Sequence, residues 1–248
     1  MKLSLAEPKY FKESISIISE LVNEARFRIT ATGIELVAMD PANVAMVLFR
    51  LFSGCFTEYN IKKDTEISIN MSNLKQILRR VGPSDILTLS LTDENKLQIQ
   101  IRGESTRTFS IPLIEIDEKP QKVPDLKFGV KISLPSSMLN RAIEDVDIVA
   151  EAVTFLADDK KFTVQAEGDL SQAKIEIPAD ERTVIQKESK DVIKAKYSIE
   201  YMKKIVNGSK IADQVEIQFN RDYPLKVEYK MVDRVVLSFI LAPRVEND

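Results

Sequence analysis

Few side chains in this sequence have the type and spacing that covalent or acid–base catalysis needs. Histidine, the commonest general base and metal ligand, is absent from all 248 residues. The single cysteine, Cys55, therefore has no imidazole to activate it as a nucleophile. Asp158 and Asp159 are adjacent carboxylates, but they fall at an expected hairpin turn, where aspartate is common. Because the sequence also lacks a GxxxxGK[ST] phosphate loop and any metal-ligand spacing, we predict no cofactor and disfavour an enzyme.

The side chains that do recur are cations at helical spacing. In NLKQILRRVG (73–82), four apolar residues take one face of a helix, while Lys75 and Arg79 lie one turn apart on the other face. The segment YMKKIVNGSK (201–210) carries Lys203, Lys204 and Lys210. These cations are either ordinary solvated helix faces or parts of one positive surface that neutralises phosphates without reading bases.

The surroundings of these cations limit the second interpretation. No aromatic residue is interleaved among the lysines and arginines of 73–80, which disfavours stacking of single-stranded bases and favours contact with a nucleic-acid backbone. The formal net charge of −3 argues weakly against nucleic-acid binding. An average nevertheless hides any segregation of opposite charges over the surface.

The helices and strands that must position these cations follow a pattern that occurs twice in the sequence. Residues 91–102, LTDENKLQIQIR, contain a turn and then alternating apolar residues, and 219–230, FNRDYPLKVEYK, repeat this pattern. Leu97 corresponds to Leu225, and the same shift of 128 residues relates the helical spacing that begins at Phe11 to that at Leu139. The sequence therefore predicts one unit in two copies.

Each copy is expected to contain a strand, a helix, several strands, a second helix and three strands. We predict helices over 8–22, from 72 to 82, over 135–149 and from 198 to 207. Between the copies, DEKPQKVPDLKF (117–128) has two prolines and mixed charge, which indicates an extended linker. The prediction is an α+β fold of two similar domains, 1–116 and 129–248, each with antiparallel sheets and two helices on one face.

The outermost strands of the two copies are expected near 107–113 and 173–178. An edge strand exposes unpaired backbone groups and invites pairing with another chain. Two unlike edges at opposite ends of one chain make a head-to-tail contact, which closes into a ring if the rotation permits. The predicted subunit-interface residues are Arg107, Phe109, Ile111, Leu113, Lys174, Ile175 and Ile177.

Four stretches carry a family resemblance: AMDPANVAMV (38–47), LKQILRR (74–80) with the strand ILTLSL after it, PLKVEYK (224–230) and FILAPRVE (239–246). In these stretches, and with consistent spacing over essentially the whole chain, the sequence is similar to sliding clamps of the proliferating cell nuclear antigen family, in its archaeal form. The resemblance implies a closed trimeric ring of two-domain subunits, with helices lining the hole, sheets outside and duplex DNA through the middle. Such a ring tethers DNA polymerase and other replication and repair enzymes, and it does no chemistry.

The resemblance also implies which residues meet each partner. The DNA-facing lining would comprise Lys9, Lys12, Lys75, Arg79, Arg80, Arg141, Lys203, Lys204 and Lys210. A groove between the domains, under the linker, would receive short hydrophobic peptides of DNA polymerase, the clamp loader, flap endonuclease and DNA ligase. Its residues would be Met39, Asn43, Val44, Met46, Val123, Pro124, Pro224, Ile240, Ala242, Pro243 and Arg244.

Two features depart from the family pattern. Gln121 stands in the linker where many relatives have an apolar residue, and the 135–149 helix carries acids beside Arg141. The ring could consist of copies of this chain or of paralogous subunits. The alternative function is a checkpoint-type clamp that does not serve the replicative polymerase, although the intact MDPANV loop and LAPRVE tail favour the replicative role.

The sequence also indicates where the protein works. A single cysteine excludes an intrachain disulfide and suits a reducing compartment. The start, MKLSLAEPKYFKES, lacks the apolar stretch of a secretory signal, and no run of about 18 apolar residues predicts a membrane span. We therefore expect the protein in the cytoplasm at chromosomal DNA, or in the nucleus if its source is eukaryotic.

Overall fold

The computed structural model describes residues 1–117 and 120–244, and its contacts divide the chain into two compact units. Unit 1 consists of Met1–Pro41, Val47–Lys122 and Met231–Leu237. Unit 2 consists of Ala42–Met46, Val123–Lys230 and the residues from Ser238 onward. Each half of the chain thus lends a short segment to the unit of the other half. The predicted boundaries at 116 and 129 stay a prediction about domains, and residues 118 and 119 of the predicted linker lie outside the described residues.

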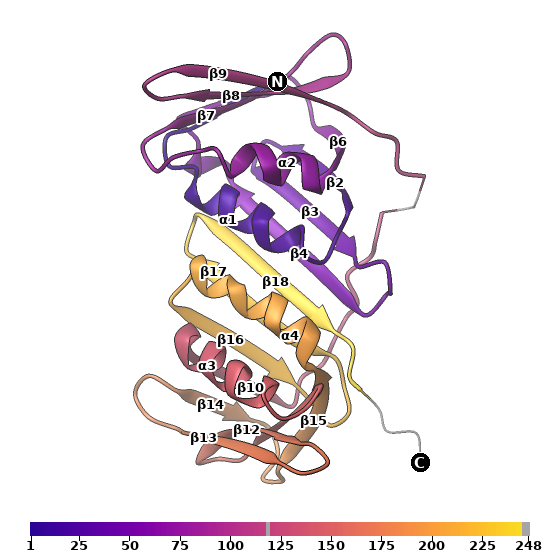
Figure 1. The fold of residues 1–248 in the computed structure, drawn as a ribbon, viewed down its shortest axis with the longest axis vertical. Coiled ribbons are helices and arrows are strands. Elements are labelled where there is room, and N and C mark those ends of the chain that lie inside the picture. The colour runs from indigo at the N-terminus through magenta and orange to yellow at the C-terminus, as the bar shows by residue number, and fades with distance from the viewer. Residues whose placement is uncertain (118–119, 245–248) are drawn as a thin grey trace. The chain divides into compact units, whose positions relative to one another are not determined.

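The first copy of the repeat folds into antiparallel sheets and two α-helices (Figure 1). Its elements are β1 (Lys2–Leu5), α1 (Lys9–Ile18), β2 (Glu24–Thr30), β3 (Gly33–Met39), β4 (Ala45–Phe52), a 3-10 turn (Ser53–Cys55), β5 (Glu58–Asn60), β6 (Thr65–Asn70), α2 (Met71–Leu78), β7 (Ile86–Leu91), β8 (Lys96–Arg102) and β9 (Thr106–Pro112). One sheet has the strand order β5-β1-β7-β8-β9, and in a second sheet β4, β3, β2 and β6 follow one another.

The second copy repeats this order of elements. They are β10 (Val130–Pro135), α3 (Ser136–Asp147), β11 (Ala152–Ala157), β12 (Lys161–Glu167), β13 (Gln172–Pro178), β14 (Val184–Lys187), β15 (Ile193–Ser198), α4 (Ile199–Ile205) with the 3-10 turn η2 (Val206–Lys210), β16 (Gln214–Phe219), β17 (Leu225–Met231) and β18 (Val235–Leu241). One sheet has the order β13-β12-β11-β15, and β14, β10, β16, β17 and β18 follow one another in a second. β4 and β18 each contain residues of both units.

The predicted internal repeat is confirmed by the element bounds. β3, β6 and β7 of the first copy match β12, β15 and β16 of the second residue for residue at the predicted shift of 128. The helices follow the same rule, because α1 and α2 correspond to α3 and α4. The chain is therefore an α+β fold of two similar halves, as the sequence predicted.

Apolar spacing explains why the helices form where they do. In α1, Phe11, Ile15 and Ile18 are at most 3 % exposed, and they recur every three to four residues, so one stripe of the helix is buried against the strands. The corresponding residues of α3 are buried in the same way. The opposite faces of both helices are left for polar and charged side chains.

The helices end earlier than the sequence suggested. α1 stops at Ile18 instead of Val22, because the amides of Glu20 and Leu21 bond to the carbonyls of Ile17 and Ile18 in tight 3-10 geometry. α2 starts at Met71, where the Asn70 side chain accepts a hydrogen bond from the Asn73 amide at 3.1 Å. These caps fix the ends of the helices that carry the predicted phosphate-binding cations.

Candidate nucleic-acid interface, partner groove and strand edges

In unit 1, α1 and α2 lie side by side (Figure 1). These two helices and the two residues after α2 carry five of the predicted phosphate-binding cations. Lys9, Arg79 and Arg80 are exposed, and no acid among the described residues lies within ion-pair distance of them. Arg79 and Arg80 follow the last turn of α2, where cations also offset the negative end of the helix dipole. These three side chains are available to an anion from solvent.

The other two cations of unit 1 are occupied within the chain. Lys12 Nζ donates a hydrogen bond to the Val81 carbonyl at 2.7 Å, which ties α1 to the end of α2. Lys75 pairs with the Glu20 carboxylate, and only 14 % of its side chain is exposed. Two of the five predicted cations therefore have partners within the chain, and the DNA-facing role of all five stays a prediction.

Unit 2 shows the same division between available and occupied cations. Arg141 and Lys210 are exposed, and among the described residues Arg141 Nε donates only to the Ser137 carbonyl of its own helix, at 3.3 Å. Lys203 pairs with Asp147 at 2.6 Å. Lys204 pairs with Glu200 at 3.0 Å, four residues earlier in the same helix.

Segment Ala42–Met46, which includes the first two residues of β4, and the C-terminal segment approach each other within unit 2. The Ala242 amide donates to the Val44 carbonyl at 2.9 Å, and the Arg244 amide donates to the Lys196 carbonyl at 2.7 Å. Asn43 holds a left-handed backbone, with φ of 57°, which asparagine tolerates better than most residues. The first of these bonds brings together Val44 and Ala242, two of the eleven residues predicted for the partner groove.

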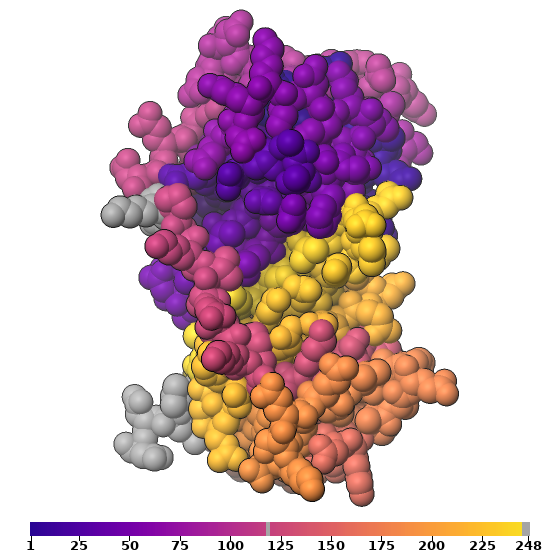
Figure 2. Space-filling model, turned by 180° about the vertical axis from the view of Figure 1, so that it is seen from behind, coloured from indigo at the N-terminus to yellow at the C-terminus, as the bar shows by residue number. Residues whose placement is uncertain are grey.

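Exposure divides the predicted groove residues into floor and wall. Met46 and Ile240 are buried, at 4 % and 9 % exposure, so they could form only a floor. Pro224, Ala242 and Pro243 are half-buried, whereas Val123 and Pro124 are exposed in the linker. Figure 2 shows the linker, in pink, on the surface. The peptide-binding role of the eleven residues stays a prediction. Val245 and Glu246, at the end of the C-terminal sequence motif, lie outside the described residues.

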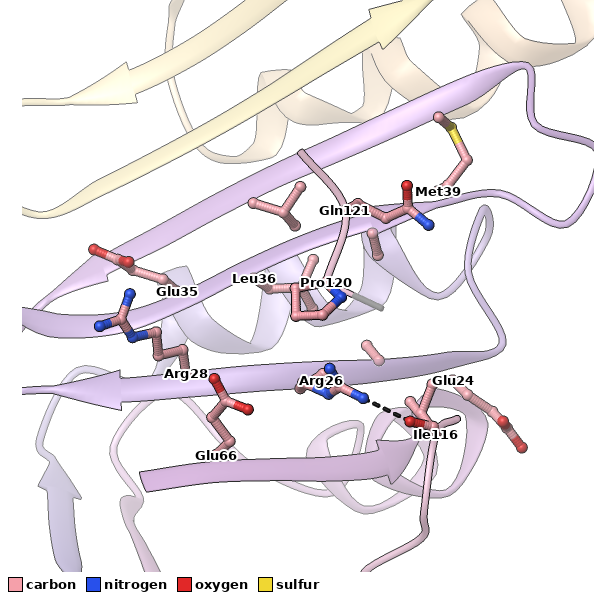
Figure 3. Close-up of a pocket in the computed structure, with 13 residues that line it drawn as sticks. Glu24, Arg26, Arg28, Glu35, Leu36, Met39, Glu66, Ile116, Pro120 and Gln121 are labelled. Carbon is pink, nitrogen blue, oxygen red and sulfur yellow. Dashed lines mark hydrogen bonds between the residues drawn. The ribbon is translucent and has the colours of Figure 1, made fainter. Parts of the chain in front are cut away.

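A cavity that the sequence did not predict lies in unit 1, against β2 and β3 (Figure 3). Its volume is about 380 Å³, and Pro120 and Gln121 of the linker lie over it. Arg26 donates to the Ile116 carbonyl at 2.6 Å, which ties the residue just before the linker to β2. Met39 is the one predicted groove residue among its lining, and Gln121 gives this wall an amide in place of an apolar side chain.

The two predicted edge strands are confirmed as sheet edges, because β9 pairs with β8 alone and β13 with β12 alone in their sheets. On β9, Arg107 donates to Asp85 at 2.7 Å and to the Arg80 carbonyl at 3.0 Å. On β13, hydrogen bonds from Lys161 and then Lys174 lower the pKa of Glu176 to about 2. The role of these edges as subunit interfaces stays a prediction.

Residues that could suggest other activities have ordinary environments. Cys55 Sγ donates to the Arg234 carbonyl at 3.2 Å, and burial raises the pKa of its thiol, which lowers the thiolate fraction. Within residues 1–117 and 120–244, no three histidine, cysteine or acidic side chains cluster as metal ligands would. No helix in that part of the chain has the length and apolarity needed to span a membrane.

Comparison with known proteins places this architecture in a family. The family model described as proliferating cell nuclear antigen, N-terminal domain, matches residues 1–120, and the model of the C-terminal domain matches residues 122–244. The chain belongs to the proliferating cell nuclear antigen family.

Individual relatives agree over nearly the full length. The chain is 35 % identical to the DNA polymerase sliding clamp of Pyrococcus furiosus, with 96 % of each chain covered. It is 34 % identical to the DNA polymerase sliding clamp of Nanoarchaeum equitans over 98 % of this chain and 99 % of the relative. The crystal structure of proliferating cell nuclear antigen from Thermococcus kodakaraensis superposes with a TM-score of 0.91 at 26 % identity, covering 98 % of this chain and 99 % of the other.

Proposed function

We propose that this chain is a DNA sliding clamp, which encircles duplex DNA as a ring of three subunits and tethers DNA polymerase. The proposal is carried by the full-length similarity to relatives named DNA polymerase sliding clamps. It is supported by the exposed cations Lys9, Arg79 and Arg80 in unit 1 and Arg141 and Lys210 in unit 2. In this proposal the protein does no chemistry and acts in the cytoplasm on chromosomal DNA.

Cations without base-reading partners suit a tether that must travel. Contact between lysine or arginine and phosphate is independent of sequence, and it weakens as salt concentration rises. Retention on DNA then comes from the closed ring instead of contact energy. A tethered polymerase gains processivity because its local concentration at the primer end rises, without any new catalytic group.

Ring closure would use the two open strand edges. β9 of one subunit would pair with β13 of the next, so that Phe109 and Ile111 meet Ile175 and Ile177. The same chain carries both edges, so copies of one chain suffice for a head-to-tail ring, and paralogous subunits with similar edges would also fit. The half-buried state of Phe109 and Ile175 in the single chain supports this arrangement.

Partners would bind through a short hydrophobic peptide. The segment around Val44, Ala242 and Pro243 offers partly exposed apolar side chains beside backbone that is already hydrogen-bonded. Such a preformed site would receive anchors from DNA polymerase, the clamp loader, flap endonuclease and DNA ligase. Competition among these peptides would decide which enzyme occupies a given subunit.

Primer extension tests the proposed function. An archaeal DNA polymerase copies a primed single-stranded circle with or without the protein and a clamp loader, and product length is measured under single-hit conditions. We expect products several times longer with the protein present. Unchanged product length, with a sliding clamp of known activity lengthening products in parallel, would overturn the proposal.

A further inference from the structure

In both copies of the repeat, a central lysine of the second helix forms an ion pair with an acid at the end of the first helix. In unit 1, Lys75 of α2 pairs with Glu20, which follows the end of α1. In unit 2, Lys203 of α4 pairs with Asp147, the last residue of α3, at 2.6 Å. Lys75 and Lys203 are equivalent residues of the repeat, separated by the shift of 128.

The acids, unlike the lysines, are not equivalent in the repeat. The residue that corresponds to Glu20 in the second copy is Ile148, and the residue that corresponds to Asp147 in the first copy is Ser19. The same ion pair is therefore made from two different positions. Simple duplication of one ancestral contact does not account for this, because duplication would have placed both acids at one position.

The placement of the acids is unfavourable for the helices themselves. A carboxylate at a helix C-terminus faces the negative end of the helix dipole, which is unfavourable for the helix. The paired lysine offsets that cost, and the pair as a whole carries no net charge. Lys75 is also shielded, with 14 % of its side chain exposed against 50 % for Glu20, so solvent reaches the acid more readily than the amine.

We infer that Glu20 and Asp147 withhold Lys75 and Lys203 from DNA phosphates and keep the hold on duplex DNA weak. The inference rests on the proposed function. In it, Glu20 and Asp147 are positioning residues that act through the lysines. Phosphate contact is carried by the available cations Lys9, Arg79, Arg80, Arg141 and Lys210. A tether that must travel gains mobility from this arrangement, because fewer counterions are exchanged at each step.

The test compares two double variants of equal charge. In Glu20→Gln with Asp147→Asn, each unit loses the acid that pairs with its lysine. In the control, Glu13→Gln with Asp145→Asn, each unit loses an acid of the same two helices, and neither acid has an ion-pair partner among the described residues. Both variants change the net charge by the same amount, so long-range electrostatics are matched.

The readout is affinity for a short linear duplex as a function of salt concentration. For the first variant we expect the slope of log K against log salt to steepen by about 0.9 for each lysine that reaches a phosphate. For the control we expect a slope like that of the wild type. Equal slopes in the two variants would overturn the inference. The proposed function fails separately: unchanged product length in primer extension would contradict it, whatever the salt slopes of the two variants.

A second measurement does not depend on DNA. A double-mutant cycle of Lys75→Met and Glu20→Gln, followed by urea unfolding, isolates the coupling between the two side chains. We expect a measurable coupling that declines with added salt, whereas Arg79→Met with Glu20→Gln should be additive. Additivity in both cycles would overturn the inference, because Lys75 would then not be held by Glu20.

Discussion

β4 and β13 occupy the same place in the two copies of the repeat, yet one is buried and the other is open. Ala45, Val47 and Leu51 of β4 have no measurable exposure, whereas four of the seven residues of β13 are exposed. The Phe52 amide at the end of β4 bonds to the Arg234 carbonyl at 3.0 Å. β13 pairs only with β12 in its sheet. The two strands therefore occupy equivalent places in the repeat, but the chain itself buries β4 and leaves one edge of β13 open.

β18 and β9 show the same contrast at the other end of each copy. Six of the seven residues of β18 are buried, whereas β9 buries Ile111 alone. Where β18 has Leu237 and Phe239, β9 has Phe109 and Ile111, so the apolar face is kept. The uncovered strand has thus retained the side chains that a neighbouring strand would bury.

The open edges also carry charge where the covered strand is apolar. Met46 and Leu48 of β4 correspond to Lys174 and Glu176 of β13. Charged side chains on an edge disfavour indiscriminate pairing with other chains, while the apolar face stays suited to a matching edge. The difference supports the proposed role of the edges, in which each edge accepts one matching strand and disfavours others.

The largest expected effect comes from removing the apolar face of an open edge. Phe109→Ser should weaken subunit association by roughly 30- to 150-fold per interface, because it removes about 2–3 kcal/mol of apolar burial. Thr108→Ser, on the exposed side of β9, is the matched control. Sedimentation velocity over a concentration series measures the change. Equal association of the two variants would remove β9 from the interface.

Removing two available cations should have the next largest effect. Arg79→Ala with Arg80→Ala should weaken binding to duplex DNA about tenfold at moderate salt and reduce the salt slope by about 1.8 per chain. Lys62→Ala with Lys63→Ala, two exposed lysines between β5 and β6, makes the same change in charge away from the helices. Fluorescence anisotropy at several salt concentrations separates the two. Equal losses would show that only net charge matters.

Truncation in the predicted groove should have a smaller effect. Ile240→Ala with Pro243→Ala should lower the affinity for a polymerase C-terminal peptide about fivefold or more, because the peptide loses apolar contact area. Because Ile240 is 9 % exposed, its truncation could also loosen the fold, so Pro243→Ala alone and thermal unfolding serve as controls. Titration calorimetry gives the affinity, and an unchanged value for a folded double variant would remove this assignment.

The smallest expected effect concerns charge on the open edge. Because Glu176 is ionised down to about pH 2, its ion pairs should persist as pH falls through the usual range of a glutamate and be lost only near pH 2. Carbon-13 NMR of its carboxyl group in Phe109→Ser, as separated chains, measures this titration. When Lys161→Ala and Lys174→Ala are added to Phe109→Ser, the pKa of Glu176 should return to the ordinary glutamate range. An ordinary pKa of Glu176 in Phe109→Ser alone would contradict the contacts described.

Much of the architecture follows from periodicity alone. Apolar residues at Phe11, Ile15 and Ile18 and the alternation of strands recur with one shift, so the element order and the two sheet edges were predictable. The predicted positions of the helix ends were less accurate, because the sequence does not show that the chain after Ile18 tightens into 3-10 turns.

Long-range pairing of charged side chains could not be predicted. Lys75 and Glu20 are separated by 55 residues, and local spacing shows a lysine on an outward helix face without showing its partner. The exchange of Ala42–Met46 and Met231–Leu237 between the units is likewise a property of tertiary packing. The cavity beside Arg26 depends on the linker returning over β3, which its composition does not specify.

Retention on a circular duplex tests the central claim most directly. The protein is loaded onto a nicked plasmid with a clamp loader, and the complex is washed at a salt concentration that abolishes phosphate contact. The amount of protein bound to the DNA is measured before and after one restriction enzyme linearises the plasmid. A closed ring predicts retention on the circle and release on linearisation. Equal retention on circular and linear plasmid would contradict encirclement.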